Sequence, residues 1–131
     1  MSDTTSEWRQ FRNSLEAGDP DLAAELLGMR PGLLHERNGL GETVLHFMAV
    51  EDNMPAIEWL LKQGSELDVY NNFGTPMIFE VAMLGYKDLF RWLIAQGANP
   101  QIRHEDGRSL LDYLVESDEP EMAVFIQALL M

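Results

Sequence analysis

A glycine recurs every 33 residues, and this repeat constrains the fold more than any other feature of the sequence. The glycines in question are Gly41, Gly74 and Gly107. Two apolar segments, Trp59–Gly64 and Trp92–Gly97, lie at the same spacing, and the register survives at Phe125. Because self-similarity at one fixed period is the mark of a repeat architecture, we expect supersecondary units stacked in a row.

Each period reads as two short helices separated by a polar break, and another helix pair precedes the first period. The predicted caps are Ser6, Asp19, Thr43 and Ser109, and the predicted first-turn prolines are Pro20, Pro55 and Pro120. Hydroxyl and carboxylate side chains accept hydrogen bonds from the first free N–H groups of a helix, and proline suits its first turn. The sequence therefore predicts an all-α chain.

We expect a single domain over residues 1–131. It would consist of a capping helix pair at about 7–36 and repeats at about 37–69, 70–102 and 103–131. One helix pair of this size cannot bury its apolar face alone, so each must stack on its neighbours. Trp59 and Trp92 stand at matching positions, and we expect them along the contact between successive second helices.

The residues within each period resemble the repeat unit of the ankyrin family, loosely N/D-x-x-G-x-T-P-L-H-x-A-A, a glycine break, then V-V-x-L-L-L-x-x-G-A. The first copy matches at Asn38, Gly41, Thr43, Leu45, His46, Ala49, Leu60, Leu61 and Gly64. The second matches at Asn71, Gly74, Ala82, Gly85, Leu93, Ile94, Gly97 and Ala98, and the third keeps Gly107, Ser109, Leu111 and Ile126. The resemblance implies an ankyrin-repeat solenoid of stacked helix-turn-helix units with short hairpin tips.

The chain departs from the family pattern at several places, two of them near the starts of the first helices. Thr75 and Pro76 stand one residue earlier than the family's Thr-Pro pair, which predicts a shifted cap for the helix that follows. His46 resembles the family's structural histidine, but Phe79 and Asp112 replace it in the later copies.

The resemblance also implies where a partner binds, since ankyrin proteins use their hairpin tips and the concave side of their first helices. The matching positions are Leu40, Glu42, Val50 and Glu51 in the first copy, Tyr70, Asn72, Phe73, Met83 and Leu84 in the second, and Arg103, Glu105, Asp106, Arg108 and Glu116 in the third. An apolar centre inside a charged rim is how binding hot spots are built. The alternative is that Tyr70 and Phe73 only pack their tip against its neighbours.

The formal charge is −13, from 22 acidic residues against 9 Lys plus Arg. Such a surface repels nucleic-acid phosphates and anionic membranes, and it attracts a basic protein. An acidic inhibitor, for instance an immunity-type protein that masks a basic toxin or enzyme, is therefore a second hypothesis. The sequence has no cysteine, no apolar run long enough to span a bilayer and an acidic start, so we expect a cytoplasmic protein.

We expect no enzymatic activity, cofactor or metal. His104, Glu105 and Asp106 could suggest a metal or acid–base site, but neighbouring side chains at a hairpin tip point in opposite directions. The last helix is apolar on most sides, so it either packs well within the chain or contacts a partner or a second copy.

Overall fold

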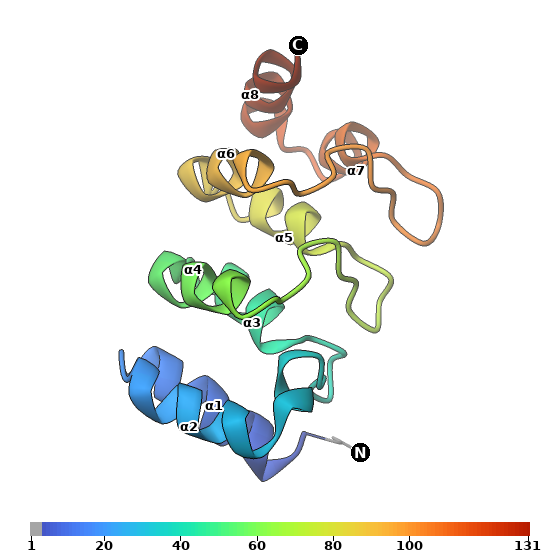
Figure 1. The fold of residues 1–131 in the computed structure, drawn as a ribbon. Helices are drawn as coiled ribbons and strands as arrows, with labels where there is room; N and C mark the ends of the chain where they lie inside the picture. The colour runs from blue at the N-terminus through green and yellow to red at the C-terminus, as the bar shows by residue number, and fades with distance from the viewer. Residues whose placement is uncertain (1–3) are drawn as a thin grey trace. The chain divides into compact units, whose positions relative to one another are not determined.

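The structure is a computed structural model that describes residues 4–131 (Figure 1). These residues form eight α-helices and no strand, apart from an isolated bridge between Tyr70 and Pro76. The predicted all-α fold is confirmed. By its internal contacts the chain divides into two compact units, residues 1–66 and 67–131.

The first unit is organised around α1. Its elements are α1 (Ser6–Glu16), α2 (Pro20–Met29), the 3-10 turn η1 (Pro31–Leu34), α3 (Val44–Val50) and α4 (Met54–Lys62). From α1, Trp8 meets Phe47 edge-on at 5.7 Å between ring centroids, and Phe11 meets Trp59 at 6.2 Å. Trp8 and Phe11 are fully buried, so α1 supplies the aromatic centre of this unit. The sequence predicted Trp59 between successive second helices. Its contact with Phe11 of α1, a first helix, was not predicted.

The second unit consists of two helix pairs. They are α5 (Met77–Met83) with α6 (Lys87–Ala95), and α7 (Leu110–Glu116) with α8 (Pro120–Leu130). Each helix sends one apolar stripe inward, as the spacing of an amphipathic helix requires. The fully buried side chains include Phe79, Phe90, Leu93, Leu114 and Ile126.

The helix starts repeat at the predicted period. The first helices α3, α5 and α7 start at 44, 77 and 110, and the second helices α4, α6 and α8 start at 54, 87 and 120. Both series advance by 33 residues per step, as the glycine spacing predicted.

Most predicted caps are confirmed. The side chains of Thr43 and Ser109 accept hydrogen bonds from the N–H groups three residues later, and Asp19 caps α2 in the same way. Ser6 is wrong as a cap, because the extended backbone lies one residue earlier and Thr5 accepts from the Trp8 N–H at 3.1 Å.

The shifted Thr-Pro pair leaves α5 in register but without a side-chain cap. Pro76 occupies the N-cap position, where Thr43 and Ser109 stand in the other copies, and it has no side-chain acceptor. Thr75 lies one residue too early to cap the helix, and its hydroxyl contacts His104 Nε2 at 3.2 Å instead. As a result, α5 has no side-chain cap, and the loop before it is linked to the next tip through Thr75 and His104.

Candidate protein-interaction surface

The tips of the first two repeats are held by an asparagine that binds its own loop. Asn38 Oδ1 accepts from the N–H groups of Leu40 and Glu42 at 3.0 and 2.9 Å. Asn71 Oδ1 accepts from the groups two and four residues later at 2.9 and 3.1 Å. An amide oxygen has two acceptor sites, so one side chain fixes the whole turn.

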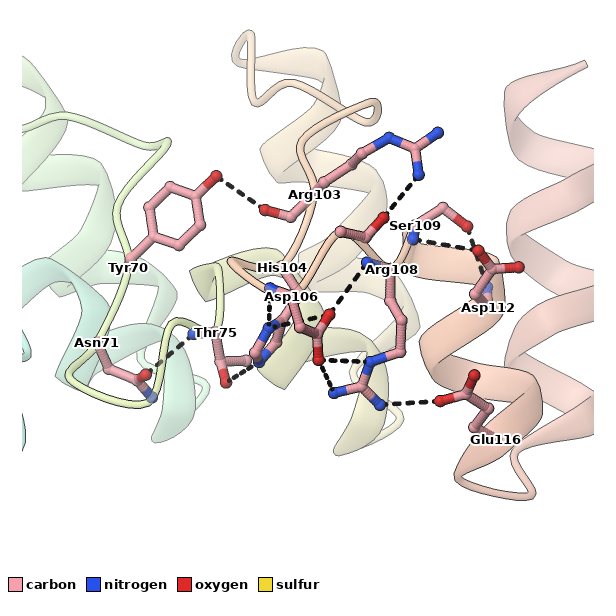
Figure 2. Close-up of polar contacts among 11 residues, drawn as sticks. Tyr70, Asn71, Thr75, Arg103, His104, Asp106, Arg108, Ser109, Asp112 and Glu116 are labelled. Carbon is pink, nitrogen blue, oxygen red and sulfur yellow. Dashed lines mark hydrogen bonds and ion pairs between the residues drawn. The ribbon is translucent and has the colours of Figure 1, made fainter.

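His104 takes the asparagine's place in the third tip (Figure 2). Its Nδ1 accepts from the Asp106 N–H at 3.1 Å, and Asp106 Oδ1 accepts from the Arg108 N–H at 3.0 Å. Because Nδ1 is an acceptor, the ring proton lies on Nε2 and is donated to the Thr75 hydroxyl. The ring also stacks on Tyr113 with a centroid distance of 5.8 Å.

The two tips of the second unit are bonded to each other. Tyr70 Oη donates to the Arg103 carbonyl at 2.8 Å (Figure 2), and the Glu105 N–H donates to the Gly74 carbonyl at 3.0 Å. Gly74 has φ +75°, and a Cβ built on it would lie 2.7 Å from the Glu105 Cβ. Only glycine allows the two backbones to come this close.

A charged network completes the third tip. Arg108 pairs with Asp106 at 2.6 Å and with Glu116 of α7 at 3.0 Å (Figure 2), and its guanidinium lies 4.8 Å from the centroid of the Tyr113 ring. The Arg108 side-chain hydrogen bond lowers the pKa of Asp106 from 3.8 to about 2. The same bond, with Glu116 second, raises the pKa of Arg108.

The side chains of His104, Glu105 and Asp106 hold the tip loops in place through these contacts. Both ring nitrogens serve the loops, Asp106 is held by Arg108, and Glu105 lies over Gly74. His104 Nδ1 lies 3.3 Å from Asp106 Oδ1, but the Glu105 side chain lies over Gly74, so the three side chains do not form a common set of ligands.

The predicted binding residues fall into three groups by exposure. The exposed ones are Leu40, Glu51, Asn72, Phe73, Leu84, Arg103, Glu105, Asp106 and Glu116, and the half-buried ones are Val50, Tyr70, Met83 and Arg108. Glu42 is wrong as an exposed position, because it is 7% exposed and accepts a hydrogen bond from the Asn38 side-chain amide. It closes its own turn.

Three large apolar side chains of the predicted set are open to solvent. Phe73 is 68% exposed, Leu40 53% and Leu84 48%. Leu40, Phe73 and Asp106 stand at the same position of successive tips. Tyr70 and Phe73 therefore differ. Tyr70 holds its tip against the next one, as the packing alternative states, whereas the ring of Phe73 stays exposed.

The set of binding residues predicted from the sequence does not include two exposed apolar side chains away from the tips. Val115 at the end of α7 is 69% exposed, and Val124 in α8 is 66% exposed. The apolar character of the last helix was the only signal for Val124. Val115 had none.

Family comparison gives an identity to this arrangement. A family model described as ankyrin repeats (3 copies) matches residues 13–104 and 45–129. The chain belongs to the ankyrin-repeat family. In this family the repeats form protein–protein interaction modules, so the confirmed resemblance also gives the general class of function.

Curated relatives are similar to the chain at low identity. Ankyrin repeat and SAM domain-containing protein 6 of Mus musculus is 24% identical over 82% of this chain, which spans 12% of that relative. Human B-cell lymphoma 3 protein is 29% identical over 61% of the chain and 18% of its own length. Human protein phosphatase 1 regulatory subunit 27 is 24% identical over 86% of the chain and 72% of its own length. The chain thus spans about an eighth of the first relative.

The α-helices of the described chain are 7 to 11 residues long, whereas a helix that crosses a bilayer needs about 20 apolar residues. Among residues 4–131, none is both long enough and apolar enough to cross a membrane.

Proposed function

We propose that this ankyrin-repeat chain is a non-enzymatic module that binds a protein partner through its tip loops and the ends of its first helices. The observation that carries the proposal is Phe73, whose ring is 68% exposed on a loop that is fixed without it. Asn71, Thr75 and Tyr70 hold that loop through the hydrogen bonds described above.

A fixed loop lowers the cost of binding. Ordering a mobile loop on association consumes part of the interaction free energy, and a preformed loop avoids that loss. Aromatic side chains on such a support are typical hot-spot residues. Phe73 combines both properties in the second unit.

Charged side chains in the same unit form a fixed polar rim. Arg108 is held by Asp106 and Glu116, and Arg103 donates to the carbonyl of its own tip at 2.8 Å. Paired charges in fixed positions favour specificity over bulk attraction. The surface therefore suits a partner with an apolar group and complementary charges around it.

The proposal is tested with Phe73→Ala in an affinity capture from a cell extract. Loss of the exposed ring is expected to remove the bound partner, since truncated hot spots cost about 2 kcal/mol or more. Met29→Ala is the matched control, because Met29 is also a large exposed apolar side chain but lies at the end of α2. A partner that both variants retain equally would contradict the role of Phe73.

The second candidate is an acidic inhibitor that masks a basic toxin or enzyme. The charge of −13 favours it, because excess acid steers basic partners to the surface. A cytoplasmic location belongs to the same proposal. Self-association through α8 is a third possibility, supported by the exposure of Val124, and light scattering of the purified chain at several concentrations tests it.

A further inference from the structure

A cavity of about 280 Å3 lies in the first unit between the α1–α2 turn and α4. The residues that line it are Leu15, Gly18, Asp19, Pro20, Pro55, Ala56 and Trp59. The lining is almost entirely apolar, with one carboxylate. The volume is slightly below that of common small-molecule sites, so it fits one side chain of a larger ligand.

In the second unit, the aromatic ring at the position equivalent to Trp59 is Phe125, and it is covered by two cations. Trp59 and Phe125 are both the sixth residue after the N-cap of their helices, counted from 53 to 59 and from 119 to 125. The Phe125 ring lies 5.6 Å from Lys87 Nζ and 5.3 Å from Arg91 Cζ. Two cations from the preceding second helix thus occupy this place in the second unit.

The helix α2 has no cation to offer to Trp59. Lys87 and Arg91 are the first and fifth residues after the N-cap of α6, and the same positions of α2 hold Pro20 and Ala24. Proline and alanine are too short to cover an indole ring. Trp59 is therefore left half-buried at the wall of a cavity.

The two segments that build the cavity carry only acidic charges. Residues 15–21 contain Glu16, Asp19 and Asp21, residues 51–59 contain Glu51, Asp52 and Glu58, and neither segment has a Lys or Arg. All six acids are exposed. Two of these acids pair with cations outside the two segments: Arg12 lies 3.9 Å from Glu16, and Lys62 lies 3.6 Å from Glu58. A positive group at the cavity is thus attracted by an excess of carboxylates.

We propose that this cavity binds a lysine or arginine side chain of a protein partner. The aliphatic stem packs against Pro20 and Pro55, and the cation lies over the Trp59 ring beside the Asp19 carboxylate. The occupant replaces what Lys87 and Arg91 supply to Phe125. The inference rests on the proposed function, in that the occupant belongs to a protein, but it involves neither the tip loops nor Phe73.

The test uses blocked tripeptides and the indole N–H signals of the 15N-labelled full chain in NMR spectra. The probes are N-acetyl-Ala-Arg-Ala-amide, the lysine peptide, and a norleucine peptide that keeps the stem without the charge. We expect the Arg and Lys peptides to shift the Trp59 signal saturably, with at least fivefold tighter binding than the norleucine peptide. The Trp92 signal serves as the internal control and stays in place.

Two variants at the cavity and one control variant give the matched comparison. Ala24→Arg places a guanidinium where α6 has Arg91, so it is expected to fill the cavity and weaken peptide binding at least tenfold. Asp19→Asn keeps an efficient N-cap but removes the charge, so binding weakens several-fold. Asp118→Asn removes an exposed carboxylate from the α7–α8 turn, where asparagine also tolerates φ +57°, and leaves binding unchanged.

Three outcomes would overturn the assignment. They are equal binding of the norleucine and arginine peptides, parallel shifts of the Trp59 and Trp92 signals, and unchanged binding by Ala24→Arg with a folded-protein spectrum. A Phe73→Ala chain that loses its partner but binds the arginine peptide normally keeps the cavity assignment and confirms the separate role of the tip.

Discussion

At the residue scale, the third tip has a histidine, His104, where the first two tips have an asparagine, and its hydrogen bonds differ accordingly. Asn38 and Asn71 each accept two backbone N–H groups of their own tip. His104 accepts one and leaves the other to Asp106, and its second ring nitrogen reaches Thr75. The third tip is therefore tied to the second by side chains that the repeat pattern alone would place in separate loops.

Gly74 gives the sharpest residue-scale prediction. Gly74→Ala adds strain at a positive φ and also places a Cβ against Glu105, whereas Gly107→Ala, at φ +95°, meets nothing within 4 Å. We expect Gly107→Ala to lower the free energy of unfolding by about 1–2 kcal/mol, and Gly74→Ala to lower it by roughly 1–3 kcal/mol more. Urea unfolding of the two variants measures the difference. Equal losses would contradict the close approach of the two tips.

Asp106 predicts a pH dependence of stability. Its pKa falls on folding from 3.8 to about 2, so its stabilising contribution is complete above pH 4 and disappears as the pH falls through 2. Asp106→Asn keeps an acceptor for the Arg108 N–H but has no charge to titrate. The gap in thermal midpoint between wild type and Asp106→Asn should be largest near pH 7 and close by pH 2. A gap that is independent of pH would contradict the ion pair.

The sequence could name the tip residues but not their pairings. Tyr70 and Arg103 stand 33 residues apart at equal positions, which gives no sign that the hydroxyl of one meets the carbonyl of the other. The sequence also could not tell that Phe73 is more exposed than Tyr70, because exposure depends on which neighbouring side chain or loop is within reach. Glu42 was mispredicted for the same reason, since its bond to Asn38 turns it inward.

At the element scale, helix starts were predictable because their signals are local. A cap acts within three residues, and the 33-residue period repeats the signal, so Thr43 and Ser109 were identified correctly. Ser6 failed by one residue because Thr5 carries an equivalent hydroxyl and already has the extended backbone of a cap. The start of α5 stays in register without a side-chain cap, so the displaced Thr-Pro signal did not move the helix start.

Ser109 provides the element-scale prediction. Its side chain accepts from the Asp112 N–H at 3.1 Å, and the Asp112 side chain accepts from the Ser109 N–H, which forms a complete capping box. Ser109→Ala should lower the free energy of unfolding by about 1 kcal/mol, and Ser109→Asn should restore most of it. Chemical denaturation of both variants checks this. A loss in Ser109→Asn as large as in Ser109→Ala would contradict the capping role.

At the scale of the whole molecule, the 33-residue glycine period was enough to predict the repeat family. The glycine spacing and the match to ankyrin repeats agree, whereas the single-domain boundaries stay a prediction. The cavity at Trp59 could not be foreseen, because it arises from short residues in α2 at positions that the second unit fills with Lys87 and Arg91. Repeats that are alike in register thus differ in what covers them.

The net charge predicts how binding responds to salt. If a basic protein is the partner, the association rate constant should fall steeply between low salt and about 0.5 M NaCl, because mobile ions screen exposed charges beyond roughly a Debye length of 10 Å. The dissociation rate constant should change much less. Surface plasmon resonance at several salt concentrations separates the two, and an association rate independent of salt would contradict the acidic-inhibitor candidate.

The central claim is that a rigid tip presents Phe73 to a protein partner, and calorimetric titration with the captured, purified partner tests it most directly. Phe73→Ala should weaken the affinity at least tenfold, about 1.4 kcal/mol, while Met29→Ala stays within twofold of wild type. Equal affinities for wild type and Phe73→Ala would contradict the claim.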